Sequence, residues 1–333
     1  LGMGDAPHDG ASGNIAAVQS PRLTAEDTFP GRLSLTAYGY ARWLARECQA
    51  VLSDQAVITA FSDREAKRQS KITALGWPQE VFRYGSSDDV AEAVGLSSSQ
   101  DGLIFPEGGS IDPRTLCRNL LAGATMRFGV EVTAITKGGD GWILTTNQGE
   151  IPARRLVLAA GSGLAKLTQD WLDPLLPFQV TAGRVSHLPS SAFPQLKAAV
   201  SFGGYMARAS DGQLALGASF DRNLPQGVVP PMDEPAHHAN KALLPEEWQD
   251  AAGDVSGWQG RVSFRLASAD RQPVAGQVDD DLYVLAALGA RGMVTGPLLG
   301  EHVATVMTGA PSPLDRGMAS VVDPFRFSAR AGF

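Results

Sequence analysis

A turn near the end of the chain combines glycine, arginine and the start of a helix, which suits an electron-rich ligand. It follows Leu282–Leu288, an almost continuous apolar run that is typical of a buried strand in a parallel sheet. The turn is Gly289-Ala290-Arg291-Gly292, and a helix with small residues opens at Met293. Glycine lets backbone approach a ligand closely, and the free N–H groups of the helix point back at the turn. The pattern favours an electron-rich carbonyl or anionic ring, for instance a reduced flavin, although any strand-turn-helix unit of a large α/β protein can look like this.

Two further turns are rich in small residues. Gly10-Ala11-Ser12-Gly13-Asn14 could pack against the diphosphate of a cofactor or form a tight turn, and composition alone favours the tight turn. Leu156–Leu164 has the pattern of a strand, a Gly-x-Gly turn at Gly161-Ser162-Gly163 and the start of a helix. Lys166 stands where a third glycine would complete a dinucleotide-binding motif, so this unit is a weak signal for a separate dinucleotide site.

The elements that must position these turns alternate at first and then become β-rich. Helices are predicted over 34–52, 63–75 and 234–248, with Asp63 as the N-cap of the second, and a further helix begins at Asp112-Pro113. Strands are predicted over 57–61, 130–136, 141–146, 156–159, 179–187, 198–208, 213–218 and 261–266. This mixture predicts an α/β domain that carries a second, α+β domain.

The composition indicates a large core and gives no sign of a membrane or metal. The chain has 333 residues, is 44% hydrophobic and carries a net charge of −7, so it can form two domains. An apolar run of about 18 residues and a signal-peptide pattern are both absent, so we expect no membrane contact. The two cysteines, Cys48 and Cys117, offer no disulfide framework, which favours a cytoplasmic setting. Only His237 and His238 are adjacent histidines, and neighbours point apart on a helix, so we expect no metal site.

Several motifs in one order resemble a known family. The segments are Gly10–Asn14, Gly108–Pro113, Gly217–Arg222, Arg265 with Pro273–Gly276, and Leu288–Gly292 with Pro297–Leu299. Together they resemble the D-amino-acid-oxidase (DAO) family of FAD-dependent oxidoreductases. Within it they resemble the oxidase half of the bifunctional bacterial enzymes that modify the wobble uridine of tRNA. The resemblance extends from about Asp5 to the end of the chain.

The resemblance implies a fold and a cofactor. The fold is an FAD/NAD(P)-binding (glutathione-reductase-like) domain with an inserted α+β antiparallel-sheet substrate domain. The first domain would comprise 1–54, 105–168 and 258–333, and the second 55–104 and 169–257. FAD would be held by Gly10, Ala11, Ser12, Gly13, Asn14, Val132, Ala160, Gly161, Gly289, Ala290, Arg291, Gly292 and Met293.

The family usually begins with a βαβ unit whose Gly-x-Gly-x-x-Gly turn holds the FAD diphosphate. This sequence shows no such unit near its start. We therefore expect it to be a fragment of a longer chain, whose upstream part supplies that unit and, in the bifunctional enzymes, a methyltransferase domain.

The resemblance also implies catalytic residues for oxidation of a C–H bond beside an amine nitrogen. Arg265 matches the family position that binds a substrate carboxylate, and a guanidinium is the planar fork that such a group needs. Arg291 would be a second carboxylate clamp near the flavin, and Tyr205 would line the substrate pocket. The alternative is structural: Arg265 would pair with Asp270 or Asp221, and Tyr205 would be an ordinary aromatic residue of a sheet.

A tRNA partner requires some cationic surface, and a net charge of −7 gives no indication of one. Arg64, Lys67, Arg68 and Lys71 follow helical spacing and are the candidates for tRNA contact, with Arg83 nearby. A solvated helix face is the commoner explanation of such a stripe.

Three functions remain open at this level. The first is removal of the carboxymethyl group from 5-carboxymethylaminomethyl(-2-thio)uridine at the tRNA wobble position, which gives 5-aminomethyl(-2-thio)uridine. The second is a small-molecule amine or amino-acid oxidase of the same fold, acting on glycine, sarcosine or D-amino acids. The third is a flavin-incompetent fragment without catalysis.

Overall fold

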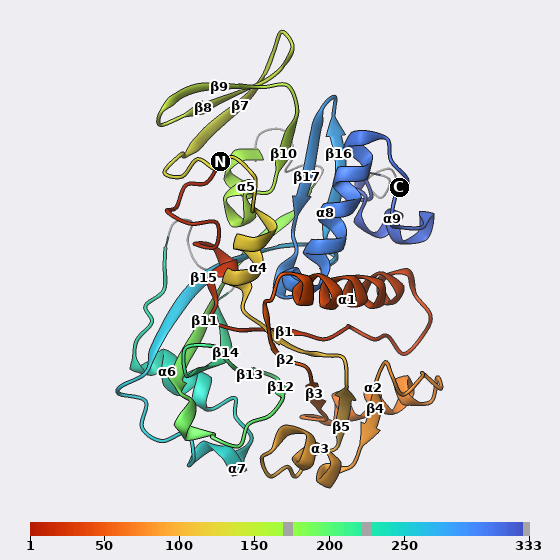
Figure 1. Cartoon of the computed structure of the whole chain (residues 1–333), viewed down its shortest axis with the longest axis vertical. Coiled ribbons are helices and arrows are strands. Elements are labelled where there is room, and N and C mark those ends of the chain that lie inside the picture. The colour runs from red at the N-terminus through yellow and green to blue at the C-terminus, as the bar shows by residue number, and fades with distance from the viewer. Residues whose placement is uncertain (169–175, 222–227, 329–333) are drawn as a thin grey trace.

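The computed structural model describes residues 1–168, 176–221 and 228–328. Strands in these residues form one sheet of eight strands and three sheets of three (Figure 1). The large sheet has the order β15-β11-β14-β13-β12-β3-β5-β4 and unites three separate stretches of sequence. Its strands are β3 (Ala56–Thr59), β4 (Arg83–Gly85), β5 (Gly102–Phe105), β11 (Phe178–Pro189), β12 (Ala199–Ser201), β13 (Tyr205–Arg208), β14 (Gln213–Asp221) and β15 (Gln259–Ser268).

Helices cover one face of the large sheet. Met206, Leu214 and Leu216 alternate with smaller residues, so all three point to that face and join a buried cluster with Trp248. The cover consists of α3 (Ser87–Val94), α6 (Glu234–Lys241) and α7 (Glu246–Gln249). The opposite face carries smaller side chains, mostly alanine, and packs against Ile15 near the start of the chain.

A second sheet and its helices form another core. β10 (Leu156–Leu158) is parallel to β17 (Leu282–Ala286), which pairs with β16 (Val274–Asp279) in antiparallel fashion. α8 (Gly292–Thr308) packs on β16 and β17, and α1 (Phe29–Glu47) packs on α8 and on α9 (Arg316–Val322). Figure 1 shows these three helices together beside β16 and β17.

The remaining elements are two small sheets and three helices. β7 (Val132–Gly138), β8 (Gly141–Thr146) and β9 (Gly149–Ala153) form an antiparallel meander. β1 (Ala17–Gln19), β6 (Gly109–Ile111) and β2 (Val51–Ser53) form the fourth sheet. The other helices are α2 (Asp63–Thr73), α4 (Pro113–Leu120) and α5 (Leu164–Thr168). Asp112 caps α4 and Pro113 is its first residue, as predicted.

The predicted helix over 34–52 starts too late and ends too late. The side chain of Thr28 accepts a hydrogen bond from Gly31 N and starts α1 five residues earlier, with a proline in its first turn. The helix ends at Glu47, and Val51–Ser53 is the strand β2. Trp43, in the second half of this helix, is 51% exposed.

Three other predicted boundaries also differ from the structure. The N-cap of α2 is Ser62, whose hydroxyl accepts from Glu65 N, so Asp63 is a residue of the helix. The predicted helix over 234–248 is two helices, α6 and α7, separated by a turn that ends at Pro245, a residue that lacks the N–H a continuous helix needs. The predicted strand over 198–208 is β12 and β13, because Gly203 has a φ of +93° and turns the chain.

The division into two domains stays a prediction. β15 belongs to the stretch 258–333 that was assigned to the cofactor domain, and it pairs along its length with β11 of the large sheet. Among the described helices, none is both long enough and apolar enough to cross a membrane.

Candidate functional site

Three short turns that the sequence singles out gather along one strand. They are η1 (Ala11–Gly13), η2 (Gly161–Gly163) and η4 (Gly289–Arg291), and each packs against β15. Leu288, just before η4, forms a β-bridge with Ala267 on the same strand. Since β15 also carries Arg265, the structure brings the predicted cofactor turns and the predicted carboxylate clamp to one place.

Arg261 holds the first of these turns against β15. Its Nη2 donates to the carbonyl oxygens of Asp9 and Gly10, at 3.0 Å each. The contact requires glycine at position 13, because a Cβ there would lie 2.0 Å from Arg261 Nη1. The adjacent Asn14 is buried, and its Oδ1 has no hydrogen-bond partner among the described residues. A buried amide oxygen without a partner is costly, as is often the case at a binding site.

The third turn ends at a helix whose first N–H groups are uncapped by any side chain. α8 begins at Gly292, and Arg291 at its N-cap position supplies no capping bond. Gly289 has a φ of +58°, which glycine adopts without strain. The amide of Gln19 fixes the start of the helix by donating to Met293 O at 2.8 Å. This end of α8 therefore presents a positive dipole and free donors to whatever occupies the turn.

Arg291 lies in an unusual electrostatic position. Solvent reaches its side chain, yet protein surrounds most of it, and this burial lowers its pKa to about 10. Arg22 and Arg68 lower the pKa further, whereas Glu65 opposes them. A guanidinium crowded by two others gains from a nearby anion or an electron-rich group.

Arg265 is desolvated and forms no ion pair within the described residues. Burial lowers its pKa, and its guanidinium stacks 4.8 Å from the centre of the Phe220 ring. The two carboxylates that offered a structural explanation have other partners: Asp221 pairs with Arg184 and Asp270 with Arg326, each at 2.9 Å. Arg265 thus keeps a free fork of donors beside an aromatic ring.

Strand register places Tyr205 on the same face as both arginines. Arg261, Val185, Gly217 and Tyr205 form one row across β15, β11, β14 and β13. Arg265 shares that face because it follows Arg261 by four residues on one strand. Burial raises the pKa of Tyr205 to about 12, and the positive charges of Arg265 and Arg261 oppose this shift. The tyrosine therefore keeps its proton at neutral pH.

Two glycines allow the close packing of these side chains. Gly217 separates Tyr205 from Val185 in the row, and Gly183 lies beneath the stacked pair. A Cβ at Gly183 would meet the Phe220 ring at 3.4 Å and Arg265 Cζ at 3.7 Å, and a Cβ at Gly217 would lie 3.1 Å from Arg184 O. A larger residue at either position would therefore displace its neighbours.

Val132 is the predicted cofactor residue that the structure does not bring to β15. It lies at the start of β7, in the small meander. α5 packs against both β7 and η2, so this helix connects Val132 to the turn at Ala160 and Gly161.

The predicted cationic stripe on α2 is shorter than expected. Arg64, Lys67 and Lys71 are exposed and have no partner among the described residues. Arg68 instead turns inward, pairs with Glu65 at 2.6 Å and donates to Leu23 O at 2.8 Å. Arg68 therefore stabilises the fold and does not extend the exposed stripe. Arg83, the fifth candidate, lies 3.4 Å from Asp89.

Three residues of this region were not predicted from the sequence. Arg261 stands four residues before Arg265 on one strand, a spacing that could have indicated a shared face. Phe220 and Arg22 carry no such signal, because Phe220 reaches Arg265 from another strand and Arg22 lies in a loop.

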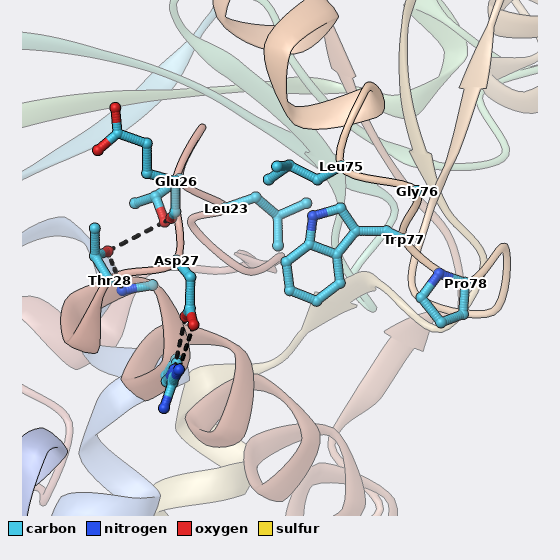
Figure 2. Close-up of a pocket in the computed structure, with 11 residues that line it drawn as sticks. Leu23, Glu26, Asp27, Thr28, Leu75, Gly76, Trp77 and Pro78 are labelled. Atoms are coloured by element: carbon cyan, nitrogen blue, oxygen red, sulfur yellow. Dashed lines mark hydrogen bonds and ion pairs between the residues drawn. The ribbon is translucent and has the colours of Figure 1, made fainter.

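A cavity of about 450 Å³ shares no lining residue with this site. It lies between the loop before α1 and the loop after α2, and Figure 2 shows the Trp77 indole directed toward Leu23. Asp27 pairs with Arg32 at its rim, and Glu26 is exposed there.

Comparison with known proteins decides the family. A family model described as FAD dependent oxidoreductase (DAO) matches residues 1–306. The chain belongs to this family. The resemblance deduced from the sequence is confirmed, and so are the FAD-dependent oxidoreductase class and its fold.

Two groups of relatives refine the comparison. The chain is 29% identical to the tRNA 5-methylaminomethyl-2-thiouridine biosynthesis bifunctional protein MnmC of Shewanella amazonensis, over 98% of the chain and 55% of that protein. It is 30% identical to the MnmC of Aeromonas hydrophila, over 97% and 54%. The chain thus spans about half the length of these curated relatives.

Solved structures share the fold. Glycine oxidase from Geobacillus kaustophilus superposes with a TM-score of 0.76 at 21% identity, over 94% of this chain and 89% of that one. Iminodiacetate oxidase from Chelativorans sp. BNC1 gives 0.74 at 21% identity, over 97% and 93%.

The residues around β15 fit the family's cofactor. The uncapped start of α8, the crowded Arg291 and the unpartnered Asn14 Oδ1 are groups that an electron-rich, hydrogen-bonding ring would satisfy. FAD held there would supply the acceptor for a hydride, which carries two electrons, and the positive end of α8 would stabilise the negative charge that results.

Proposed function

We propose that the chain oxidises the carboxymethylaminomethyl side chain of the wobble uridine in tRNA. The C–H bond beside the amine nitrogen breaks, its hydride goes to FAD, and the nitrogen lone pair forms a C=N bond. Water then adds to that carbon, the C–N bond breaks, and the products are the 5-aminomethyl nucleoside and glyoxylate. The MnmC proteins of two bacteria, similar over nearly the whole chain, support this substrate.

The observation that carries the proposal is the state of Arg265. A partly buried guanidinium that forms no ion pair within the described residues gains from a ligand that supplies the anion. The substrate's glycine-like arm ends in a carboxylate, which accepts two parallel hydrogen bonds from that fork. Arg265 would then hold the carboxylate, and Tyr205, protonated, would donate a hydrogen bond to the substrate from the same face of the sheet.

Each remaining side chain has a proposed role. Arg291 and the start of α8 would face the electron-rich part of the flavin, with Gly289, Ala290, Gly292 and Met293 forming the turn. Gly10–Asn14, Val132, Ala160 and Gly161 would hold the rest of the cofactor. The second half found in the bifunctional relatives, a methyltransferase by our expectation, stays a prediction.

A small-molecule amine or amino-acid oxidase is the second candidate. The net charge of −7 favours it, because a protein that binds RNA usually carries a basic face. The free donors of Arg265 would also bind the carboxylate of glycine or sarcosine.

The deciding experiment compares substrates on one flavin-loaded preparation. We expect turnover of tRNA that carries the carboxymethylaminomethyl group, measured by nucleoside analysis of the product, to exceed that of free glycine and sarcosine. Faster oxidation of the free amino acids, with unchanged tRNA, would replace this function by the second candidate.

A further inference from the structure

An exposed aromatic ring lies against the turn that leads into Tyr205. β3 and β12 are parallel neighbours, with Ile58 opposite Ser201, so their carboxyl ends meet at one edge of the sheet. Phe61 follows β3 by two residues and Gly203 follows β12 by two. A Cβ at Gly203 would lie 3.2 Å from the Phe61 ring, so the ring covers the turn that leads into Tyr205.

Phe61 is 41% exposed although it touches this turn. Phe220, whose ring stacks on Arg265 from β14, is 43% exposed. Both rings therefore have apolar surface in contact with water, and burial of that surface by a ligand would be favourable.

The helix that begins beside Phe61 has two distinct sides. On the inner side, Glu65 and Arg68 lie close enough to Arg291 to change its pKa. On the outer side, Arg64, Lys67 and Lys71 are exposed and unpaired within the described residues. The inner side of α2 therefore lies near the turn that contains Arg291, and its outer side presents three exposed cations.

We infer that Phe61 stacks on an unpaired base of a single-stranded RNA loop, next to the nucleotide that enters the site, while Arg64, Lys67 and Lys71 bind its phosphates. The inference rests on the proposed function and deepens it. Aromatic rings combined with cations are what single-stranded RNA needs, because every base has a face for stacking and every linkage carries a charge. A free amino acid has neither a base to stack nor a phosphate to bind, so it gains nothing from Phe61 or these cations.

The test uses an anticodon stem–loop RNA and the flavin-loaded protein. Phe61→Ala is expected to weaken RNA binding about tenfold, as loss of one stacked base does, without changing how affinity depends on salt. Phe61→Trp keeps a stacking ring and should restore binding. Phe325→Ala, at a ring of similar exposure (43%) near the end of the chain, is the matched control and should bind normally.

The cations are tested by the salt dependence itself. Changing Arg64, Lys67 and Lys71 together to Gln should flatten the logarithmic salt slope by about 2, since each phosphate contact on a single strand contributes about 0.7. Changing three exposed cations elsewhere, Arg154, Lys197 and Arg271, should leave the slope unchanged.

The outcomes separate this inference from the function on which it rests. If the unaltered protein does not turn over tRNA, the proposed function is wrong. The RNA affinity of Phe61→Ala still tests whether Phe61 stacks on a base. Normal tRNA turnover together with unchanged RNA affinity in Phe61→Ala overturns the inference alone. An equal loss of glycine and tRNA turnover in that variant also overturns it, because Phe61 would then support the site around Arg265 rather than RNA binding.

Discussion

Two arginines on one face of β15 have different partners and hence different roles. Arg261 is bound to backbone carbonyls of the turn at Gly10, so it organises the site. Arg265 stacks on the Phe220 ring near the Tyr205 phenol. It forms no ion pair within the described residues, so its donors are available. Residue types alone could not distinguish them, because the difference comes from which residues lie opposite each arginine.

We expect Arg265→Ala to reduce kcat/KM on a carboxylate substrate by about 2–5 kcal/mol in transition-state free energy. Arg265→Lys should also lose most activity, because an ammonium keeps the charge without the planar fork. Steady-state kinetics measures both, and the flavin spectrum should stay intact as the control for folding. Unaltered kinetics in a folded Arg265→Ala protein would leave Arg265 with a structural role.

Gly13 should tolerate no side chain. The added Cβ of Gly13→Ala would overlap Arg261 Nη1, so we expect a loss of about 1–3 kcal/mol in the free energy of unfolding and a lower Tm. Gly10→Ala is the matched control, since a Cβ there meets nothing within 4 Å. Equal Tm values for the two variants would contradict the close approach of Arg261 to this turn.

His187 should make stability depend on pH. Burial lowers its pKa to about 4, with Arg261, Arg114 and His237 adding to the decrease and Asp211 opposing it. Because the unfolded chain binds the proton more readily, the stabilisation is fully present above about pH 6.5 and is lost as pH falls toward 4.

Urea unfolding at pH 7 and pH 5 measures this dependence. His187→Gln cannot be protonated, so it should lose less stability between the two pH values than the unaltered protein. A substitution at the exposed His238 serves as the comparison, and an identical loss in His187→Gln would contradict the assignment.

At the scale of elements, α2 shows what sequence patterns can and cannot predict. Its existence, length and outer cations followed from helical spacing, because that signal is local. The Arg68 side chain points inward because Leu23 O and Glu65 accept its hydrogen bonds. The position of α2 near Arg291 is set by segments far away in sequence. Local patterns carry no information about such neighbours.

The start of α2 gives a test of its cap. Ser62→Ala should destabilise the protein by about 1 kcal/mol, because Glu65 N loses its acceptor. Asp63→Ala should cost less, about 0.3–1 kcal/mol, since Asp63 acts only through the helix dipole. Thermal unfolding measures both, and a larger effect at Asp63 would reinstate it as the cap.

At the scale of the whole molecule, motif order predicted more than periodicity did. The order of the glycine-rich segments indicated the family and the fold, whereas helix and strand patterns missed several boundaries. The pairing of β15 with β11 could not be predicted from the sequence, because the register between strands about 80 residues apart is set by packing rather than by local composition. The gathering of three turns on β15 was hidden for the same reason.

β15 is an edge strand, held by β11 on one side and touched by all three turns. A local opening of this strand would release the cofactor turns and the carboxylate clamp together, so both sites belong to one cooperative unit. Hydrogen–deuterium exchange should therefore slow in the β15 amides when FAD or a carboxylate inhibitor binds, and slow most when both are present. Protection confined to the turns, with β15 unaffected, would show that the strand is only a passive support.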